Sequence, residues 1–185
     1  MPTCSEARSS LLALLRGAEH FNTEVFPAKE ALFAGLATGQ SPSALFIACA
    51  DSRIDPSLIT QTDPGNLFIL RNIGNLVPAY GEMLGGVSAA VEYAVMALEV
   101  STIIVCGHSD CGAMKALLDP ENSGLDAMPT VKSWLRNAEA ARAATLSAFR
   151  ADDAGPATVR CIAEQNVLLQ LAHLRTHPAV VAGLA

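Results

Sequence analysis

The segment ALFIACADSR, residues 44–53, joins five apolar residues, Ala44–Ala48, to a cluster of polar and charged ones. A short, continuously apolar run is typical of a strand that is covered on both faces of a parallel sheet. The runs Asn66–Leu70 and Thr102–Cys106 share this pattern, and Gly85–Leu98 has apolar residues at helical spacing between them. Strands that alternate with helices predict an α/β fold, with an open, mostly parallel sheet and flanking helices.

Three further segments predict helices from the spacing of their apolar residues: 8–37, Pro129–Phe149 and Thr158–Leu174. Pro178 ends the last of them. No internal repeat or linker interrupts the chain, so we expect a single domain over residues 1–185, with residues 1–37 as an N-terminal helical arm. The pattern alone fits an arm that packs on a neighbouring subunit or on its own domain.

The composition narrows the classes of partner. Hydrophobic residues make up 51% of the 185 residues and charged residues 16%, which favours large buried areas, including contacts in an oligomer. The net charge is −6 and no basic run occurs, so we expect neither nucleic acid nor an anionic membrane surface as partner. No apolar run approaches the ~20 residues that span a bilayer. The run Leu11–Leu15 is shorter than the roughly 7–15 residues of a secretory signal core.

The chain has five cysteines, an odd number that favours metal ligands, core residues or reactive thiols over a disulfide framework. We therefore expect a cytoplasmic protein. Cys106 and Cys161 lie in a predicted strand and a predicted helix and fit core positions, whereas Cys4 lies near the N-terminus. Cys49 and Cys111 lie instead in polar segments that follow predicted strands.

Side chains that bind metals follow two of these strands. Cys49 comes directly after the first strand, and His108 and Cys111 follow the third. Ligands of open α/β sheets lie beyond the carboxyl ends of the strands, so these side chains share one crevice if the two strands are neighbours. Two thiolates and one imidazole without a fourth strong ligand are typical of a catalytic zinc site, because a structural site completes the tetrahedron. We expect one Zn²⁺ per chain.

Asp51 and Arg53 add a carboxylate and a guanidinium two and four residues after Cys49. This pair favours a reactive site over a zinc-binding assembly protein without catalysis, since an inert zinc site has no use for it. Asp110 either supports the ligands beside it or is a simple loop carboxylate. A thiol redox function is disfavoured because the chain has no Cys-x-x-Cys.

These segments resemble the β-class carbonic anhydrases, and the resemblance covers nearly the whole chain. Besides the two segments described above, it rests on these motifs: Gly39–Pro42, Pro64–Phe68, Arg71–Asn75, Glu92–Val95, Gly107–Gly112 and Thr176–Pro178. The segment around Gln40 is most similar to the plant-type branch of that family.

The resemblance implies that Cys49, His108 and Cys111 hold zinc, and that Asp51 and Arg53 form a hydrogen-bonded dyad beside the open position. The reaction that it implies is the reversible hydration of carbon dioxide to bicarbonate and a proton, through hydroxide on the zinc. If Arg53 releases Asp51, the carboxylate becomes a fourth metal ligand. Because two thiolates cancel the formal charge of Zn²⁺, we expect an activity that rises on the alkaline side.

The resemblance also implies substrate contacts. Gln40 contacts bound bicarbonate or water, and Phe68, Ile73 and Tyr93 line the carbon dioxide pocket. Part of that pocket comes from a partner subunit, so a homodimer or a higher homo-oligomer is implied. Hydrolysis of carbon disulfide or carbonyl sulfide on the same site is an alternative for which the sequence gives no sign.

The chain departs from the family at two places. Phe46 stands where one branch has a Trp in a noncatalytic bicarbonate pocket, so we do not expect a bicarbonate-driven switch. Family members also continue into a further strand, whereas this chain stops at Ala185, and it is C-terminally short on that comparison. An uncovered sheet edge favours pairing with another chain.

Overall fold

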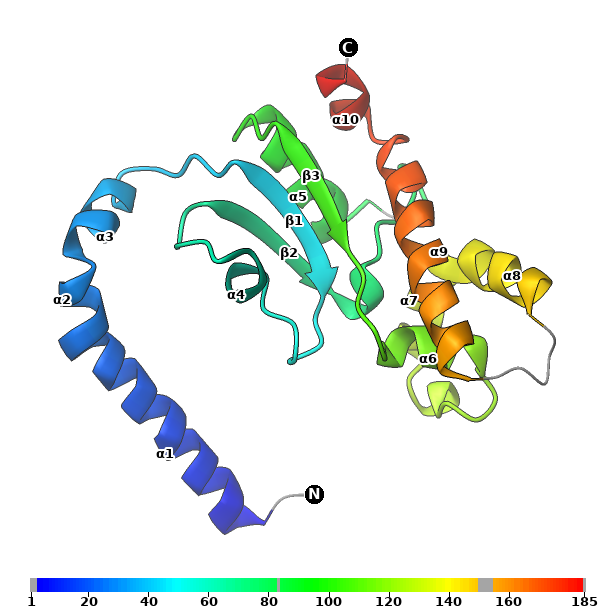
Figure 1. Cartoon of the computed structure of the whole chain (residues 1–185), viewed down its shortest axis with the longest axis horizontal. Coiled ribbons are helices and arrows are strands. Elements are labelled where there is room, and N and C mark those ends of the chain that lie inside the picture. Colours follow the sequence, from blue (N-terminus) through cyan, green and yellow to red (C-terminus); the bar gives the residue numbers. More distant parts are fainter. Residues whose placement is uncertain (1–2, 83, 150–154, 185) are drawn as a thin grey trace. The chain divides into compact units, whose positions relative to one another are not determined.

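The sheet consists of three parallel strands in the order β2–β1–β3. Its strands are β1 (Ala44–Cys49), β2 (Leu67–Asn72) and β3 (Thr102–Cys106). The computed structural model describes residues 3–82, 84–149 and 155–184 (Figure 1). All three predicted strands are confirmed, and with them the open α/β fold with flanking helices. The expectation about Ala185 lies outside the described residues.

The central strand β1 is the buried one. All six of its residues are buried, with Leu45 and Ile47 at 0% exposure. The prediction that each strand is covered on both faces is wrong for β2 and β3, whose residues are half-buried or exposed. Each outer strand has a single neighbour in the sheet, and the helices of one chain leave part of its faces open.

Seven helices follow the first strand within the described part of the chain: α4 (Pro56–Thr60), α5 (Gly86–Met96), α6 (Gly112–Leu118), α7 (Pro129–Leu135), α8 (Glu139–Ala148), α9 (Pro156–Leu174) and α10 (Pro178–Gly183). The sequence predicted α5 and α9 nearly to their ends. It missed α4 and α6, both short. Pro178 starts α10 at its first position, where a missing N–H costs nothing, although we expected that proline to end a helix.

A continuous helix over residues 129–149 is also wrong, because a 3-10 turn at Arg136–Ala138 separates α7 from α8. Asn137 donates from its side-chain amide to the carbonyl of Trp134 at 2.8 Å. Such a local bond competes with helical hydrogen bonding and explains the break. Trp134 in turn donates from Nε1 to the carbonyl of Ile73 at 2.8 Å, which ties α7 to the turn after β2.

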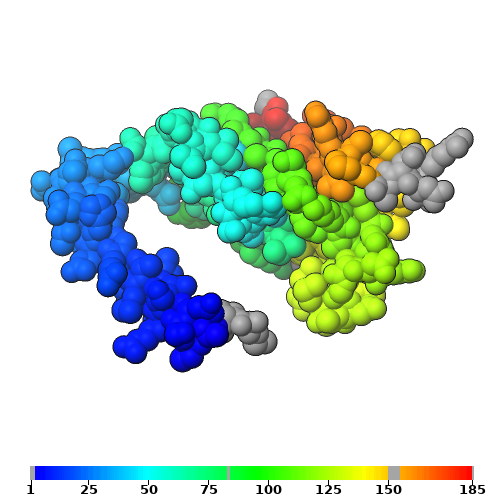
Figure 2. Space-filling view, turned by 60° about the horizontal axis from the view of Figure 1, so that its bottom comes forward, coloured from blue at the N-terminus to red at the C-terminus, as the bar shows by residue number. Residues whose placement is uncertain are grey.

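Residues up to Gln40 form one compact unit, and those from Ser41 onward form a second. The first unit contains α1 (Cys4–His20), a π-helical turn (Phe21–Val25), α2 (Phe26–Ala28) and α3 (Glu30–Leu36), and is drawn in blue in Figure 2. The predicted helical arm is confirmed, and the single domain stays a prediction. None of its helical residues is buried, so the apolar stripe Leu11–Leu15 is exposed. None of the described helices is long and apolar enough to cross a membrane.

A row of polar side chains on α9 holds the chain segment that follows β2. Asn166 donates to the carbonyl of Gly74 at 3.0 Å, and Oε1 of Gln170 accepts from the N–H of Val77 at 2.7 Å. Gln170 also donates to the side-chain oxygen of Asn166 at 2.8 Å, and His173 contacts the Val77 carbonyl at 2.8 Å. Since Asn166 and Gln170 are buried, these bonds satisfy backbone groups that water does not reach.

We predict that Gln170→Ala lowers the free energy of unfolding by about 1–3 kcal/mol, because it leaves the buried N–H of Val77 without a partner. Urea denaturation of the purified protein measures this change. Arg160→Ala on the same helix is the control, since that side chain is 81% exposed and pairs with Glu164 alone among the interactions recorded for it. Equal losses in both variants would contradict the role assigned to Gln170.

Candidate metal centre

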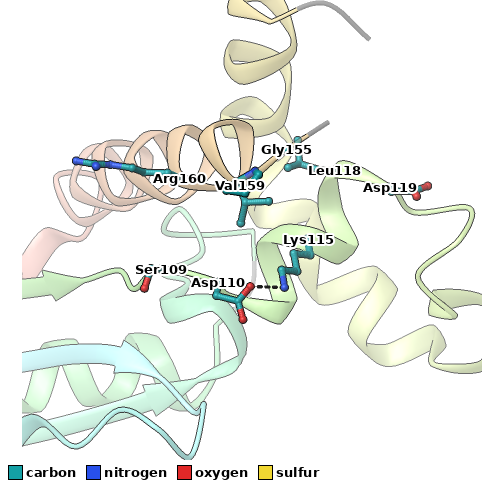
Figure 3. Close-up of a pocket in the computed structure, with 9 residues that line it drawn as sticks. Ser109, Asp110, Lys115, Leu118, Asp119, Gly155, Val159 and Arg160 are labelled. Atoms are coloured by element: carbon teal, nitrogen blue, oxygen red, sulfur yellow. Dashed lines mark ion pairs between the residues drawn. The ribbon is translucent and has the colours of Figure 1, made fainter. Parts of the chain in front are cut away.

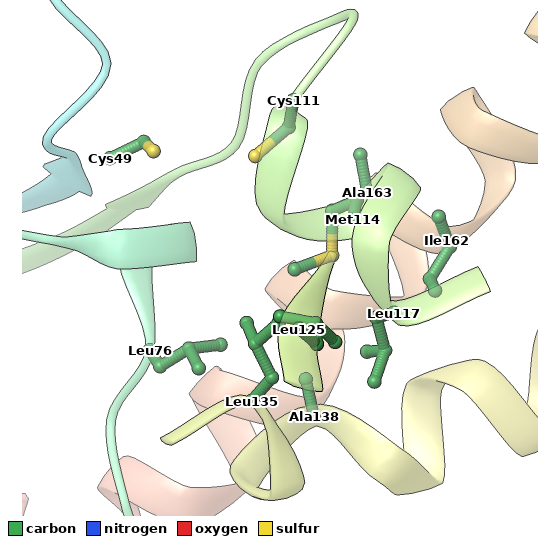
Figure 4. Close-up of a cluster of buried hydrophobic side chains, with 10 residues drawn as sticks. All are labelled: Cys49, Leu76, Cys111, Met114, Leu117, Leu125, Leu135, Ala138, Ile162 and Ala163. Atoms are coloured by element: carbon green, nitrogen blue, oxygen red, sulfur yellow. The ribbon is translucent and has the colours of Figure 1, made fainter. Parts of the chain in front are cut away.

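The ends of β1 and β3 bring three metal-binding side chains together. Cys49 is the last residue of β1, while His108 and Cys111 follow β3, which pairs with β1. Their ligand atoms all lie within 4.8 Å of one another. Figure 4 shows the sulfur atoms of Cys49 and Cys111 turned toward each other, from the end of the strand and from the start of α6. The structure thus supports the crevice that the sequence predicted.

The loop that carries His108 is shaped by a close approach to α9. A Cβ atom on Gly107 would lie 2.9 Å from Cγ2 of Val167 and 3.4 Å from the carbonyl of Ala163, so any larger residue would force the Val167 side chain to shift. Three residues after Gly107, Asp110 adopts a left-handed backbone with φ of 56°, a conformation that aspartate tolerates better than most residues. The loop therefore turns sharply before α6 begins.

The donor set fits zinc. Two thiols and one imidazole are soft and borderline ligands of the kind that Zn²⁺ prefers. Nε2 of His108 is buried and has no hydrogen-bond partner among the described residues, although a buried polar atom normally has one. A metal ion at this place would satisfy that nitrogen. Asp51 lies outside the group of three, with its Oδ2 4.0 Å from Nε2 of His108.

The titrations of the two thiols depend on each other. A hydrogen bond from Cys111 lowers the pKa of Cys49 to about 4, and the backbone N–H groups of Asp51 and Gly74 lower it further. The Gly74 N–H donates to Sγ of Cys49 at 3.4 Å. The same shared bond, together with burial, raises the pKa of Cys111 well above its usual range. These shifts favour the thiolate form at Cys49 and the thiol form at Cys111, and metal binding requires both to be deprotonated.

Asp51 and Arg53 form the predicted ion pair. Nε of Arg53 donates to Oδ1 of Asp51 at 2.9 Å and Nη2 donates to Oδ2 at 2.7 Å, so the contact is bidentate. The backbone N–H of Arg53 donates to Oδ1 at 3.0 Å. These bonds hold the pKa of Asp51 well below its usual range and keep the carboxylate ionised.

Arg71 holds the backbone of the segment that carries Asp51 and Arg53. It lies on β2 and donates from Nε to the carbonyl of Cys49 at 3.1 Å and from Nη2 to that of Asp51 at 2.6 Å. Ala50 donates its N–H to the carbonyl of Asn72 at 2.8 Å. The loop after β1 is therefore tied to the neighbouring strand on both sides of its turn.

The predicted pocket residues fall into two groups. Phe68 on β2 and Tyr93 on α5 lie together, with ring centroids 5.9 Å apart. Ile73 and Tyr93 are 43% and 49% exposed, so a single chain leaves this apolar surface open. Gln40 is the last residue of the N-terminal unit. The substrate contacts of all four residues stay predictions.

Sequence reasoning missed the support that α9 gives to the site. The carbonyl of Gly74 accepts from Asn166, and the N–H of Gly74 donates to Cys49, so the helix acts on the first thiolate through one residue. Gly74 has a φ of 78°, and a Cβ there would lie 3.2 Å from Cβ of Ala113. The signal was present in the sequence: Asn166 and Gln170 are four residues apart and share a face of the helix with Ile162 and Ala163, which are apolar.

Comparison with known proteins gives a consistent result. A family model described as "Carbonic anhydrase" matches residues 44–185. A carbonic anhydrase of Pseudomonas aeruginosa is 51% identical over 171 residues, which cover 92% of this chain and 76% of that protein. A carbonic anhydrase of Synechococcus elongatus is 46% identical over 174 residues, 92% of this chain and 62% of the relative. The chain is thus shorter than the curated relatives that it matches.

Solved structures of β-carbonic anhydrases are also similar to this chain. The β-carbonic anhydrase CcaA has a TM-score of 0.90 at 44% identity, over 95% of this chain and 78% of that one. A structure described as one of two tetrameric β-carbonic anhydrases of Sordaria macrospora has a TM-score of 0.82 at 28% identity, over 95% and 86% of the two chains.

We predict that Cys49→Ser and His108→Ala each abolish stoichiometric zinc binding, because two remaining side chains do not hold the ion. Metal analysis of the purified variants after dialysis measures the zinc content. Cys106→Ser is the matched control: this half-buried cysteine lies on β3 outside the group of three and should leave the zinc content unchanged. Zinc retained in either ligand variant would disprove the assignment.

Proposed function

This chain belongs to the β-class carbonic anhydrases, and on that basis we propose that it catalyses the reversible hydration of carbon dioxide to bicarbonate and a proton. The proposal rests on one observation, the position of Asp51 beside the three metal-binding side chains. A buried group of two thiols and one imidazole lies beside an ionised carboxylate, with 4.0 Å between Nε2 of His108 and Oδ2 of Asp51. A purely structural metal site needs no such carboxylate.

Cys49, His108 and Cys111 would hold a zinc ion and leave its fourth position open. Zinc in such a site supplies Lewis-acid chemistry and lowers the pKa of water from about 15.7 toward ~7. The geometry suits such an ion without it being present, since the three ligand atoms lie within 4.8 Å of one another and Nε2 of His108 is buried without a hydrogen-bond partner among the described residues.

Asp51 orients the nucleophile. Because Arg53 keeps its carboxylate ionised, Asp51 accepts hydrogen bonds and donates none. It therefore accepts the hydrogen of the attacking water and aims the lone pair of the oxygen at carbon. Arg53 fixes the carboxylate through two parallel bonds, a geometry that also retains Asp51 and keeps it from becoming a metal ligand itself.

Carbon dioxide offers few polar handles, and apolar walls suit it. Phe68 and Tyr93 provide two adjacent rings, and Ile73 adds an aliphatic side chain at the turn after β2. We assign these three residues to the carbon dioxide pocket and Gln40 to the contact with bicarbonate or water. These roles are part of the proposal.

The proposal includes a homodimer or a higher homo-oligomer. Large apolar side chains are exposed on β2, on the turn that follows it and on α5, among them Ile69, Ile73, Tyr93 and Met96, and a second subunit would cover them. It also includes a cytoplasmic location, with which the five cysteines agree, since all of them are free.

We predict rapid carbon dioxide hydration by the zinc-loaded protein, with a rate that rises from neutral to alkaline pH because two thiolates offset the charge of the metal. Stopped-flow measurement with a pH indicator tests this. Asp51→Ala should retain zinc and lose roughly 10- to 100-fold in kcat, since it removes the group that orients the nucleophile. Zinc binding without hydration at any pH would leave a non-catalytic zinc-binding protein in place of the enzyme.

We also predict a molar mass of at least twice the 19.3 kDa of one chain by light scattering after size-exclusion chromatography. Replacing Met96, which is 61% exposed, by Lys should shift the protein toward smaller species, because it places a charge on the apolar surface. A monodisperse monomer at micromolar concentration would contradict the proposed assembly.

A further inference from the structure

Arg53 bonds to both of the loops that carry metal-binding residues. Besides its bidentate contact with Asp51, it donates from Nη1 to Oδ2 of Asp110 at 3.2 Å. Nη2 also donates to the backbone carbonyl of Asp110 at 3.2 Å. Asp51 follows β1, whereas Asp110 lies between His108 and Cys111. One guanidinium therefore cross-links the two loops.

Asp110 is held from its other side by Lys115. The two form an ion pair, drawn as the dashed line in Figure 3, at one wall of an open groove of about 540 Å³. Lys115 lies on α6, the helix that starts directly after Cys111. The carboxylate of Asp110 thus has a cation on either side, and its place is set by the same loop and helix that set the place of Cys111.

These ion pairs contribute little to the stability of the fold. The side chains of Arg53, Asp110 and Lys115 are 58%, 57% and 51% exposed, and exposed ion pairs contribute little to stability. Two side-chain bonds to Asp51 already order the Arg53 side chain, however, so its further bonds to Asp110 cost little additional side-chain entropy. What the network determines is where the guanidinium lies.

We propose that Asp110, held by Lys115, is a positioning residue that keeps Arg53 attached to the His108–Cys111 loop and so fixes Asp51 beside the metal ligands. The inference rests on the proposed function, because it explains how the carboxylate that orients the nucleophile is itself held. The cross-link between the loops, in contrast, exists without substrate and is testable by metal binding alone.

The test is a double-mutant cycle on metal affinity, measured for the full-length protein by competition for Co²⁺ with a chromophoric chelator. Asp110→Ala should weaken Co²⁺ binding roughly two- to fivefold, since the two ligand loops lose a tie. In an Arg53→Ala background the same substitution should have no further effect, because Asp110 acts through Arg53. Asp110→Asn should restore part of the affinity, since its amide oxygen still accepts from Arg53.

A matched control is available. Asp126 is an exposed carboxylate that pairs with Lys132 at 2.6 Å, away from the three metal ligands in the sequence and outside their loops. Asp126→Ala removes an ion pair of the same kind and should leave the Co²⁺ affinity unchanged.

The cobalt absorption spectrum supplies a second readout. Asp110→Ala should shift its ligand-field bands without adding a protein ligand, because Asp51 keeps its two side-chain bonds to Arg53 but is no longer fixed beside the open position. An unchanged affinity and spectrum in Asp110→Ala, or an equal loss with and without Arg53, would overturn the inference. If Asp110→Ala fails to fold, Asp110→Asn and Lys115→Ala replace it in the same double-mutant cycle. If the wild type does not hydrate carbon dioxide, the proposed function is contradicted. The double-mutant cycle on Co²⁺ affinity still tests the role of Asp110 in that case, because it does not depend on activity.

Discussion

Parallel pairing of β1 with β3 is the constraint on which the rest of the site depends. Ala48 lies opposite Cys106 in that register, so Cys49 and the loop after β3 leave the sheet at the same edge. A shift of one residue would turn every side chain of β1 to the opposite face. This register brings the two thiols and the imidazole together at the ends of β1 and β3.

Around this pairing, polar side chains replace water as partners of the backbone. Arg71 bonds the carbonyls of the loop after β1, and Asn166 and Gln170 bond the turn after β2. Loss of one of these bonds destabilises the fold, because leaving a buried polar group unpaired costs more free energy than one hydrogen bond contributes. The loops that bear the metal ligands are therefore held by a rigid frame, and the orienting pair Asp51–Arg53 lies at its open side.

The pattern of apolar runs was sufficient to predict the strands and the crossover helix, because such runs are local in the sequence. The cluster at the strand ends also required β1 and β3 to be neighbours, a condition that the sequence left open and the sheet order meets. The resemblance to a family added roles for Asp51 and Arg53. What local sequence did not reveal depends on partners far along the chain. The break after Trp134 accompanies a bond to Ile73, and Gln170 has its partner at Val77. The half-exposed faces of β2 and β3 were missed because the pattern of an apolar run does not say whether its cover comes from the same chain.

The central claim is that two thiolates and one imidazole hold a zinc ion whose fourth position is open. X-ray absorption at the zinc edge of the loaded protein tests it most directly. We expect two sulfur atoms at about 2.3 Å, one imidazole nitrogen at about 2.0–2.1 Å and a single further light atom. A shell with one sulfur atom or none, or with a second imidazole, would contradict it.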